Sequence, residues 1–335
     1  MREARLWKTE KDDCVLCLLC AHHCRLKTNE RGRCGVRLNQ GGKLVTLADR
    51  VPSMGFDPVE KKPLFHFLPG TTTLSFGTMG CNFSCLFCQN SSLSQTPKLG
   101  GRIQGDVVEA ESLVALAGQH GARSISYTYS EPTIFFELMQ DTALKAKEAG
   151  MANIMVSNGF QSPQCLEALD GLIDAANIDL KAFTDTFYRD ICDGSLKPVL
   201  RNLKHIREMG WHLEVTTLLI PGLNDSDKEL GEMANFIGKE LGPDVPWHIS
   251  GFYPTFKMMD RPPTPLETLE RARRIGQKAG LWFVYHGNRH GRGGEDTICP
   301  GCGKTVMSRS GFTLLETRLK GSDCSFCGHR ILAAH

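Results

Sequence analysis

Cys81-Asn82-Phe83-Ser84-Cys85-Leu86-Phe87-Cys88 places three cysteines in the spacing C-x3-C-x2-C. The motif follows an apolar run, Thr73-Leu74-Ser75-Phe76, that predicts a β-strand. Three thiolates can hold three irons of a [4Fe-4S] cube and leave the fourth iron open to a small molecule, whereas four-cysteine ligation fills every corner. The spacing therefore predicts an iron–sulfur site at which chemistry occurs; an ordinary metal knuckle with an unidentified fourth ligand is the alternative.

Length and composition limit the possible classes of protein. A chain of 335 residues with 41% apolar residues is long enough for one α/β barrel with small appendages. The net charge of +2 comes from interspersed charges, which disfavours nucleic acid as the main ligand. No uncharged apolar run of about 18 residues occurs and Met1 leads into charged sequence, so we expect a cytoplasmic protein without membrane spans.

From residue 71 to about residue 285, strand and helix patterns alternate, which is typical of a parallel sheet with crossover helices. Strands are predicted near 72–77, 123–128, 152–156, 175–180, 212–219, 246–250 and 281–285. Helices are predicted near 109–120, 133–149, 162–171, 184–209 with a break around Gly194, 226–241 and 265–279. This alternation predicts a TIM-like or open β/α barrel, whose site would lie at the carboxyl ends of the strands.

Most of the other cysteines occur in two short segments, which favours metal or Fe–S ligation over disulfide bonds. Residues 1–50 are too poor in large apolar side chains to form a core of their own and are expected to fold around metal. Zinc bound by four of the five cysteines of this segment is the first hypothesis; an auxiliary Fe–S cluster and free thiols are the alternatives. The preferred four are Cys17, Cys20, Cys24 and Cys34, which leaves Cys14. His22 and His23 could each be a ligand, but solvated turn residues are the favoured interpretation.

The C-terminal segment has two C-x2-C pairs, each with a glycine directly after the second cysteine. Cys299, Cys302, Cys324 and Cys327 predict a zinc ribbon, with another Fe–S cluster as the alternative. Cys165 and Cys192 are isolated in the sequence and are expected to be core or surface thiols.

The C-x3-C-x2-C motif, with the aromatic Phe87 directly before its last cysteine, resembles that of the radical S-adenosylmethionine (radical SAM) superfamily. The resemblance implies a partial TIM-type barrel of about six β/α units, a [4Fe-4S] cluster on Cys81, Cys85 and Cys88, and an open iron that binds SAM. In that family an electron from the cluster cleaves SAM, and the resulting 5′-deoxyadenosyl radical abstracts hydrogen. Reduced flavodoxin or ferredoxin would deliver the electron.

Further residues of the predicted strand ends match this family. Glu131, in Tyr129-Ser130-Glu131-Pro132, stands where the family holds the amino group of SAM, although a carboxylate before a proline also suits a helix N-terminus. Asp179-Leu180-Lys181 resembles the triplet that lines the SAM carboxylate side in pyruvate formate-lyase activating enzymes. The resemblance also gives SAM-binding roles to Phe87, Asn158 and His248, whereas Val156 stands where those enzymes carry an aspartate. A lone strand histidine such as His248 also occurs as a bonded core residue.

Over nearly the whole chain the motifs resemble the radical SAM enzymes of the AmmeMemoRadiSam system, which are pyruvate formate-lyase activating enzyme-like. The motifs are the cysteine-rich N-terminus, Asp57-Pro58-Val59-Glu60-Lys61-Lys62-Pro63, Cys88-Gln89-Asn90, Ile220-Pro221-Gly222-Leu223-Asn224-Asp225 and the terminal ribbon. The resemblance implies Memo-like and AMMECR-like partner proteins. It predicts four parts: a metal-binding segment (1–50), an extended packing lead-in (51–70), the barrel (71–290) and the ribbon (291–335).

Two other functions remain open at this point. The chain could be a glycyl-radical-enzyme activase, which would form a radical on a partner protein; from another class, it could be a non-catalytic zinc-ribbon scaffold. No side chain stands out by pattern as a general acid or base, so catalytic residues beyond those that bind the cofactors are not assigned.

Overall fold

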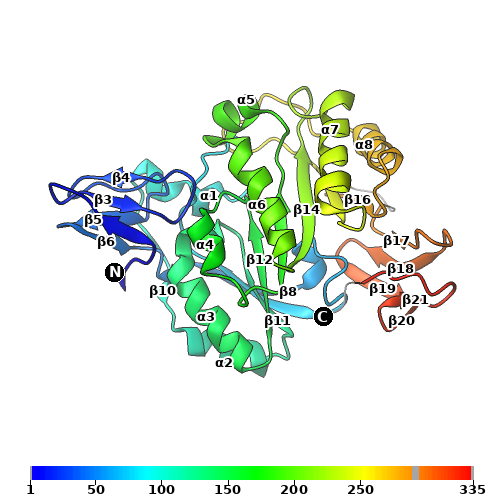
Figure 1. Cartoon of the computed structure of the whole chain (residues 1–335), viewed down its shortest axis with the longest axis horizontal. Helices are drawn as coiled ribbons and strands as arrows, with labels where there is room; N and C mark the ends of the chain where they lie inside the picture. The colour runs from blue at the N-terminus through cyan, green and yellow to red at the C-terminus, as the bar shows by residue number, and fades with distance from the viewer. Residues whose placement is uncertain (1, 289–293, 333–335) are drawn as a thin grey trace.

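The computed structural model of the chain describes residues 2–288 and 294–332. Figure 1 shows a central layer of strands covered by helices, with a small N-terminal β module at one end and the C-terminal strands at the other. The chain therefore has one large α/β body with an appendage on each side, as its length predicts.

The central sheet orders its strands β16-β15-β14-β13-β12-β11-β9-β8. Within residues 2–288 the seven from β9 to β16 run parallel, and β8 pairs antiparallel with β9. The bounds are β8 (Ser53–Pro58), β9 (Thr72–Gly77), β11 (Ser124–Tyr127), β12 (Ala152–Ser157), β13 (Ala175–Asp179), β14 (His212–Leu219), β15 (Trp247–Gly251) and β16 (Val284–Gly287). The order of strands and helices along the chain confirms the predicted alternation. Among the described strands, β16 and β8 do not pair with each other, so the sheet is open between them.

The longer helices connect successive strands of this sheet. They are α2 (Ala110–Gln119), α3 (Phe136–Glu148), α4 (Pro163–Glu167), α6 (Leu196–Glu208), α7 (Asp227–Phe236) and α8 (Leu266–Lys278). Shorter pieces are α1 (Ser91–Ser94), α5 (Asp185–Phe187), 3-10 turns at Val59–Lys61, Thr96–Leu99 and Pro132–Phe135, and π turns at Tyr188–Cys192 and Ile237–Leu241. The predicted break around Gly194 is confirmed, because Asp193 takes a left-handed φ of 60° between the π turn and α6.

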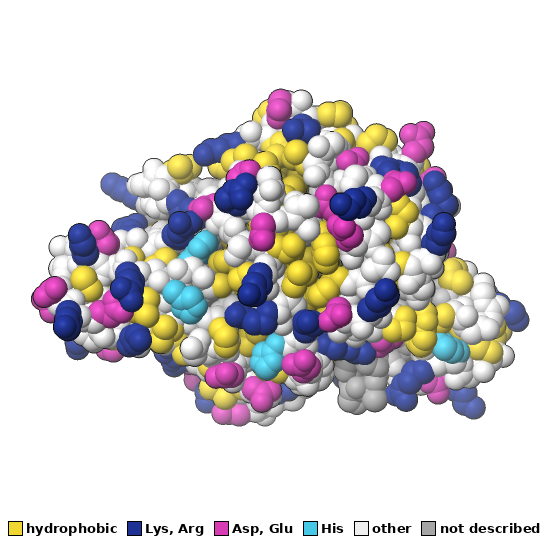
Figure 2. Space-filling view, turned by 45° about the horizontal axis from the view of Figure 1, so that its top comes forward, with side chains coloured by type: hydrophobic (Ala, Val, Ile, Leu, Met, Phe, Trp, Pro, Cys, Tyr) yellow, Lys and Arg dark blue, Asp and Glu magenta, His cyan; other side chains and the backbone are white. Residues whose placement is uncertain are grey.

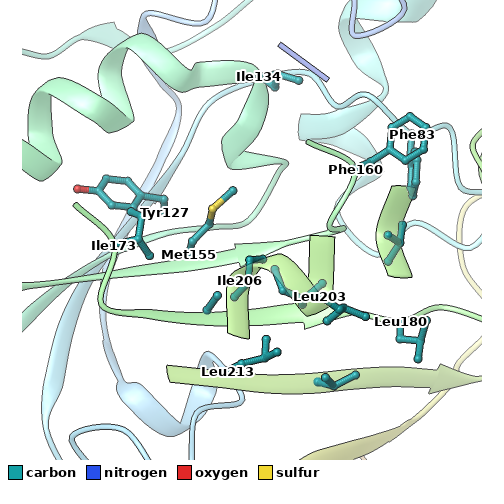
Figure 3. Close-up of a cluster of buried hydrophobic side chains, with 14 of the residues drawn as sticks. Phe83, Tyr127, Ile134, Met155, Phe160, Ile173, Leu180, Leu203, Ile206 and Leu213 are labelled. Atoms are coloured by element: carbon teal, nitrogen blue, oxygen red, sulfur yellow. The ribbon is translucent and has the colours of Figure 1, made fainter. Parts of the chain in front are cut away.

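The core of the body lies between the sheet and its helices. Figure 3 shows Tyr127 and Met155 from neighbouring strands, Leu203 from α6, and Phe83 from the loop after β9. Tyr127 is fully buried and donates its hydroxyl hydrogen to Asn153 Oδ1 at 2.8 Å, which satisfies its polar end. The cysteine loop is thus anchored in the main core by an aromatic side chain.

The N-terminal module consists of two small antiparallel sheets. Their strands are β1 (Arg2–Glu3), β6 (Lys43–Thr46) and β5 (Arg37–Gln40), and β2 (Trp7–Thr9), β3 (Val15–Cys17) and β4 (Arg25–Leu26); β7 (Arg50–Val51) pairs with β10 (Asp106–Val107). Its buried side chains, such as Val15 and Leu19, belong to the same apolar cluster as the barrel core. A buried ion pair between Arg37 and Glu137 of α3 joins the two parts. As predicted, the module has no separate core.

The C-terminal strands pack against the lead-in (51–70) at Phe65. They are β17 (Thr297–Ile298), β18 (Thr305–Ser310), β19 (Thr313–Thr317), β20 (Leu319–Lys320) and β21 (Asp323–Cys324). The buried Arg309 donates to the carbonyl oxygen of Phe65 at 2.8 Å and lies 4.3 Å from the centre of its ring. The predicted boundary between barrel and ribbon, at residues 290 and 291, lies outside the described residues.

Candidate functional site

A cavity of about 300 Å³ opens at the carboxyl ends of the parallel strands. The residues that the sequence assigns to one site and that line it are Cys81, Cys85, Cys88, Phe87, Glu131, Asn158, Asp179 and Lys181. Residues that lie far apart in the chain meet here because all parallel strands end at the same edge of the sheet. The cavity is where the strand-end side chains can act on one ligand.

The cysteine loop is held by bonds from several directions. The Ser84 amide donates to the carbonyl of Cys192 at 2.8 Å, and the Leu86 amide donates to the carbonyl of Ile191 at 3.0 Å. Cys88 Sγ lies 3.0 Å from the hydroxyl of Ser94. The loop is therefore held by contacts with α1 and with the π turn before α6.

Close packing between Gly194 and the ring of Phe83 leaves no room for a side chain at position 194. An added Cβ on Gly194 would lie 2.4 Å from Cε1 of Phe83, so only glycine fits there without displacing the ring.

A hydrogen bond with the thiol of Cys192, together with burial, raises the pKa of Cys85 well above its usual value. Cys192, expected to be an ordinary isolated thiol, therefore contacts a cysteine of the motif.

Glu131 and Asn158 form one wall of the cavity. The buried Glu131 carboxylate accepts bonds from the hydroxyl of Ser157 at 2.7 Å and the amide of Asn158 at 2.9 Å, and two more from Thr133. Burial raises its pKa, against the opposing effect of these bonds. The Asn158 side chain donates to Asn82 Oδ1 at 2.7 Å and lies 3.8 Å from Cys81 Sγ. This wall thus connects β11 and β12 to the first cysteine of the motif.

Asp179 and Lys181 form the opposite wall, directly after β13. Lys181 Nζ lies 2.8 Å from Asp179 Oδ2 and 5.7 Å from the centre of the Phe87 ring. Burial alone would lower the pKa of Lys181, but the negative charge of Asp179 raises it well above its usual value. This favours the protonated, cationic form of Lys181 beside the cysteine loop.

His248 lies elsewhere in the barrel interior. Its Nε2 is 2.6 Å from the carboxylate of Glu214, and His248 is not among the residues that line the cavity. Glu214, which the sequence analysis did not single out, also binds His212 and the backbone amides of Phe65 and His66. An acidic residue in the middle of a predicted strand was the available signal for this buried anchor.

Other lining residues were missed because they are backbone or small polar positions. Tyr129 adopts a left-handed φ of 66°, and its carbonyl accepts a bond from Asn90 at 2.6 Å. The hydroxyl of Ser130 is buried and has no hydrogen-bond partner within the described residues. The non-glycine turn at Tyr129 has no sequence signature that would have revealed it.

The two further cysteine groups lie at opposite ends of the molecule. The sulfur atoms of Cys299, Cys302, Cys324 and Cys327 all lie within 4.8 Å of one another and could hold a metal ion. Cys17, Cys20, Cys24 and Cys34 line one small enclosed cavity together with His22. The buried Cys165 and the solvent-exposed His23 line neither of these sites nor the main cavity.

One face of the molecule carries charges of both signs. On the face drawn in Figure 2, basic and acidic side chains are interspersed, without a continuous basic stripe. None of the described helices is both long enough and apolar enough to cross a bilayer.

Comparison with known proteins agrees with this geometry. A family model described as the radical SAM superfamily matches residues 76–237. The chain is 41% identical over 334 residues to an uncharacterised protein of Methanocaldococcus jannaschii, covering 99% of each chain. It is 22% identical over 184 residues to the benzylsuccinate synthase activating enzyme of Thauera aromatica, covering 54% of this chain and 56% of that one. The crystal structure of Streptococcus suis SuiB bound to S-adenosylmethionine has a similar fold, with a TM-score of 0.51 and 15% identity, over 64% of this chain and 49% of that one.

Proposed function

The chain belongs to the radical SAM superfamily, and on that basis we propose that it is an enzyme that reductively cleaves SAM at a [4Fe-4S] cluster and abstracts hydrogen from a substrate. One observation carries this proposal. Cys81, Cys85 and Cys88 line a single cavity together with the amide of Asn158 and the ammonium group of Lys181. Three soft ligands and a polar wall then face the same ligand-sized space.

The donor set fits such a cluster. Among the described residues that line the cavity, the cysteines are the three of the motif, so one iron would remain free for a small molecule. When bound, the cluster supplies the electron that splits the sulfonium of SAM, and the 5′-deoxyadenosyl radical so formed takes a hydrogen atom from the substrate. The amide of Asn158 would donate toward Cys81, and the hydroxyl of Ser94 toward Cys88.

The two walls suit the two ends of the amino-acid part of SAM. Lys181 provides a cation for the carboxylate, and its bond to Asp179 fixes the ammonium group beside Phe87, which we assign to the adenine. The unpartnered hydroxyl of Ser130 is available to the amino group of SAM.

Glu131 would act mainly by shaping the wall, because both of its oxygens already accept bonds from Thr133, Ser157 and Asn158. His248 is bonded to Glu214 in the barrel interior, so the proposal assigns it no contact with SAM.

The first experiment measures SAM cleavage by anaerobically reconstituted enzyme reduced with dithionite. Cys85→Ala should abolish 5′-deoxyadenosine formation, while Cys14→Ala, which changes a thiol outside the main cavity, should leave it unchanged. Retained circular dichroism and zinc content would show that the Cys85 variant is folded. Undiminished 5′-deoxyadenosine formation by that variant would refute the proposal.

A second experiment asks which class of substrate supplies the hydrogen atom. The reduced enzyme is given SAM and a lysate of deuterium-grown cells, divided into macromolecular and small-molecule fractions. Deuterium in 5′-deoxyadenosine from the macromolecular fraction would favour an activase or maturase. An activase is considered because the relatives named as activating enzymes match about half of this chain. Deuterium from the small-molecule fraction would favour a biosynthetic enzyme.

Partner proteins enter the proposal at two points. Radical SAM enzymes generally receive their electron from flavodoxin or ferredoxin, and we propose the same class of donor here. The Memo-like and AMMECR-like partners implied by sequence resemblance remain a prediction, which co-purification of the three tagged proteins from one cell would test.

A further inference from the structure

The N-terminal module contains a thiol-lined cavity that the proposed reaction does not use. Cys17, Cys20, Cys24 and Cys34 line it, and the proximity of the other three thiols adds to burial in raising the pKa of Cys20. Cys14 lines a different, surface-exposed hollow with Glu10 and Arg25. The fold therefore brings together four of the five N-terminal cysteines and separates the fifth.

The distances between the sulfur atoms distinguish this group from a zinc site. Four thiolates at about 2.3 Å from one tetrahedral zinc stand about 3.8 Å apart. The C-terminal group has that spacing, with 3.6 Å between Cys299 and Cys327 and 3.8 Å between Cys302 and Cys324. Among the described residues no three thiols of the N-terminal cavity lie within 4.8 Å of one another, and the same is true of the three in the main cavity. In this respect the N-terminal thiols resemble those of the main cavity and differ from the C-terminal group.

The buried arginine at this cavity, Arg37, has an unpaired donor among the described residues. Arg37 is 1% exposed, lies with its Nη1 3.8 Å from Cys17 Sγ, and forms a buried ion pair with Glu137. Its Nε–H is buried without a hydrogen-bond partner in the described part of the chain. Buried donors are rarely left unpaired in folded proteins. The sulfide ions of an Fe–S cluster could accept a hydrogen bond from this Nε–H. A single zinc ion would add no such acceptor.

From this spacing and this unpaired donor we propose that Cys17, Cys20, Cys24 and Cys34 hold an auxiliary [4Fe-4S] cluster. Among the described residues, neither cavity holds three thiols as close together as those of the C-terminal group. The cluster is ligated by four cysteines, so all of its irons are occupied, and it serves electron transfer and not ligand binding.

The auxiliary site lies directly beside the cysteine motif of the main cavity. An added Cβ on Gly80 would stand 2.9 Å from the carbonyl oxygen of Cys34, and Gly80 precedes Cys81 in the chain. His22, which lines the auxiliary cavity, places its Nε2 2.8 Å from the carbonyl oxygen of Asn82. The two clusters would therefore be near neighbours, connected by one peptide contact and one hydrogen bond.

The test removes the first cluster and asks what remains. A full-length chain carrying Cys81→Ala, Cys85→Ala and Cys88→Ala is purified without oxygen and analysed for iron, sulfide and zinc, and its reduced form is examined by electron paramagnetic resonance. About four irons and four sulfides per chain should remain, with the signal of a reduced [4Fe-4S] cluster and about one zinc. The readout needs no SAM chemistry, so it stands or falls independently of the proposed function.

Two additions to that variant locate the remaining iron. Adding Cys20→Ala and Cys24→Ala should remove it while leaving the zinc, whereas adding Cys14→Ala should change neither metal. Iron that persists after the change of Cys20 and Cys24 would place the cluster elsewhere and overturn the proposal. A chain with no iron and about two zinc ions would also overturn it. The unmutated protein gives a check that needs no variant to fold, since it should contain about eight irons and not four.

Discussion

Replacement of Glu214 by glutamine should destabilise the barrel by removing a buried acceptor that joins the lead-in to two strands. Oε1 accepts from the amide of His66 at 2.8 Å and lies 2.9 Å from Nε2 of His212. Oε2 accepts from the amide of Phe65 at 3.0 Å and lies 2.6 Å from Nε2 of His248. Each oxygen therefore serves one backbone amide and one imidazole.

This arrangement sets the size of the effect of Glu214→Gln. Whichever way the new amide is oriented, its NH₂ group must face the backbone N–H of either Phe65 or His66, and that donor loses its acceptor. An imidazole can adapt by changing its tautomer, but a backbone amide cannot. The orphaned amide costs about 1–3 kcal/mol, and the bonds that remain lose the carboxylate charge, so we expect a total of about 3 kcal/mol. For a chain of this length that corresponds to a fall in melting temperature of about 4 °C.

The assay is thermal unfolding followed by circular dichroism, on proteins of equal metal content. Glu208→Gln is the matched control, because Glu208 is 73% exposed and its removal should change stability by no more than about 0.5 kcal/mol. Equal melting temperatures for the Glu214 variant and the unmutated protein at pH 7 would refute the reasoning.

The dependence on pH gives a second check of the same residue. Burial alone would raise the pKa of Glu214, but the bonds with His212 and His248 lower it well below its usual value. A carboxyl group whose folded-state pKa is depressed contributes stability above its unfolded pKa, and that contribution disappears as the pH falls through the folded value. The difference between the two proteins should therefore stay constant from pH 7 to about pH 5 and shrink below about pH 4.

Three further predictions concern the cysteine sites and the cavity. Gly194→Ala should displace Phe83 and reduce the iron bound after reconstitution, whereas Gly231→Ala, which has open space around it, should not; equal iron contents would contradict the packing argument. Lys181→Met should raise the KM for SAM about 10–100-fold, because a charge-assisted bond contributes about 1.5–3 kcal/mol, and an unchanged KM in the 5′-deoxyadenosine assay would remove Lys181 from the site. Cys302→Ser should lose about one zinc and make residues 294–332 sensitive to protease, and a fully protected segment without zinc would show that the metal is not structural.

The order of strands and helices could be predicted from the sequence because local pattern decides it. The strand predicted near 212–219 and the helix break around Gly194 agree with the structure, since both rest on apolar periodicity and on glycine. The strands of the N-terminal module were harder to predict. Its strands are two to four residues long, and its apolar side chains are buried only by docking on α3 and the barrel, which no local pattern reveals.

Site residues could be predicted where the chemistry requires a particular residue type at a recognisable spacing. Residues that reach the site only through the folding of the chain could not be predicted. The cysteine motif and the Asp179-Leu180-Lys181 triplet carry recognisable spacing, and the structure brings them to one cavity. Cys192 gave no such signal, because its contact with Cys85 arises from the π turn before α6. Likewise, only the three-dimensional structure shows that the imidazole of His248 is hydrogen-bonded to Glu214.

The ribbon at one end of the molecule is mechanically connected to the cavity through the lead-in. Arg309 of β18 is buried against Phe65, and the backbone of that residue is held in turn by Glu214 of β14. Two residues earlier, Pro63 lines the cavity itself. Displacement of Arg309 would leave the carbonyl of Phe65 buried without this partner, which is costly enough to loosen the lead-in. A change in the C-terminal strands can therefore alter the shape of the cavity without touching it.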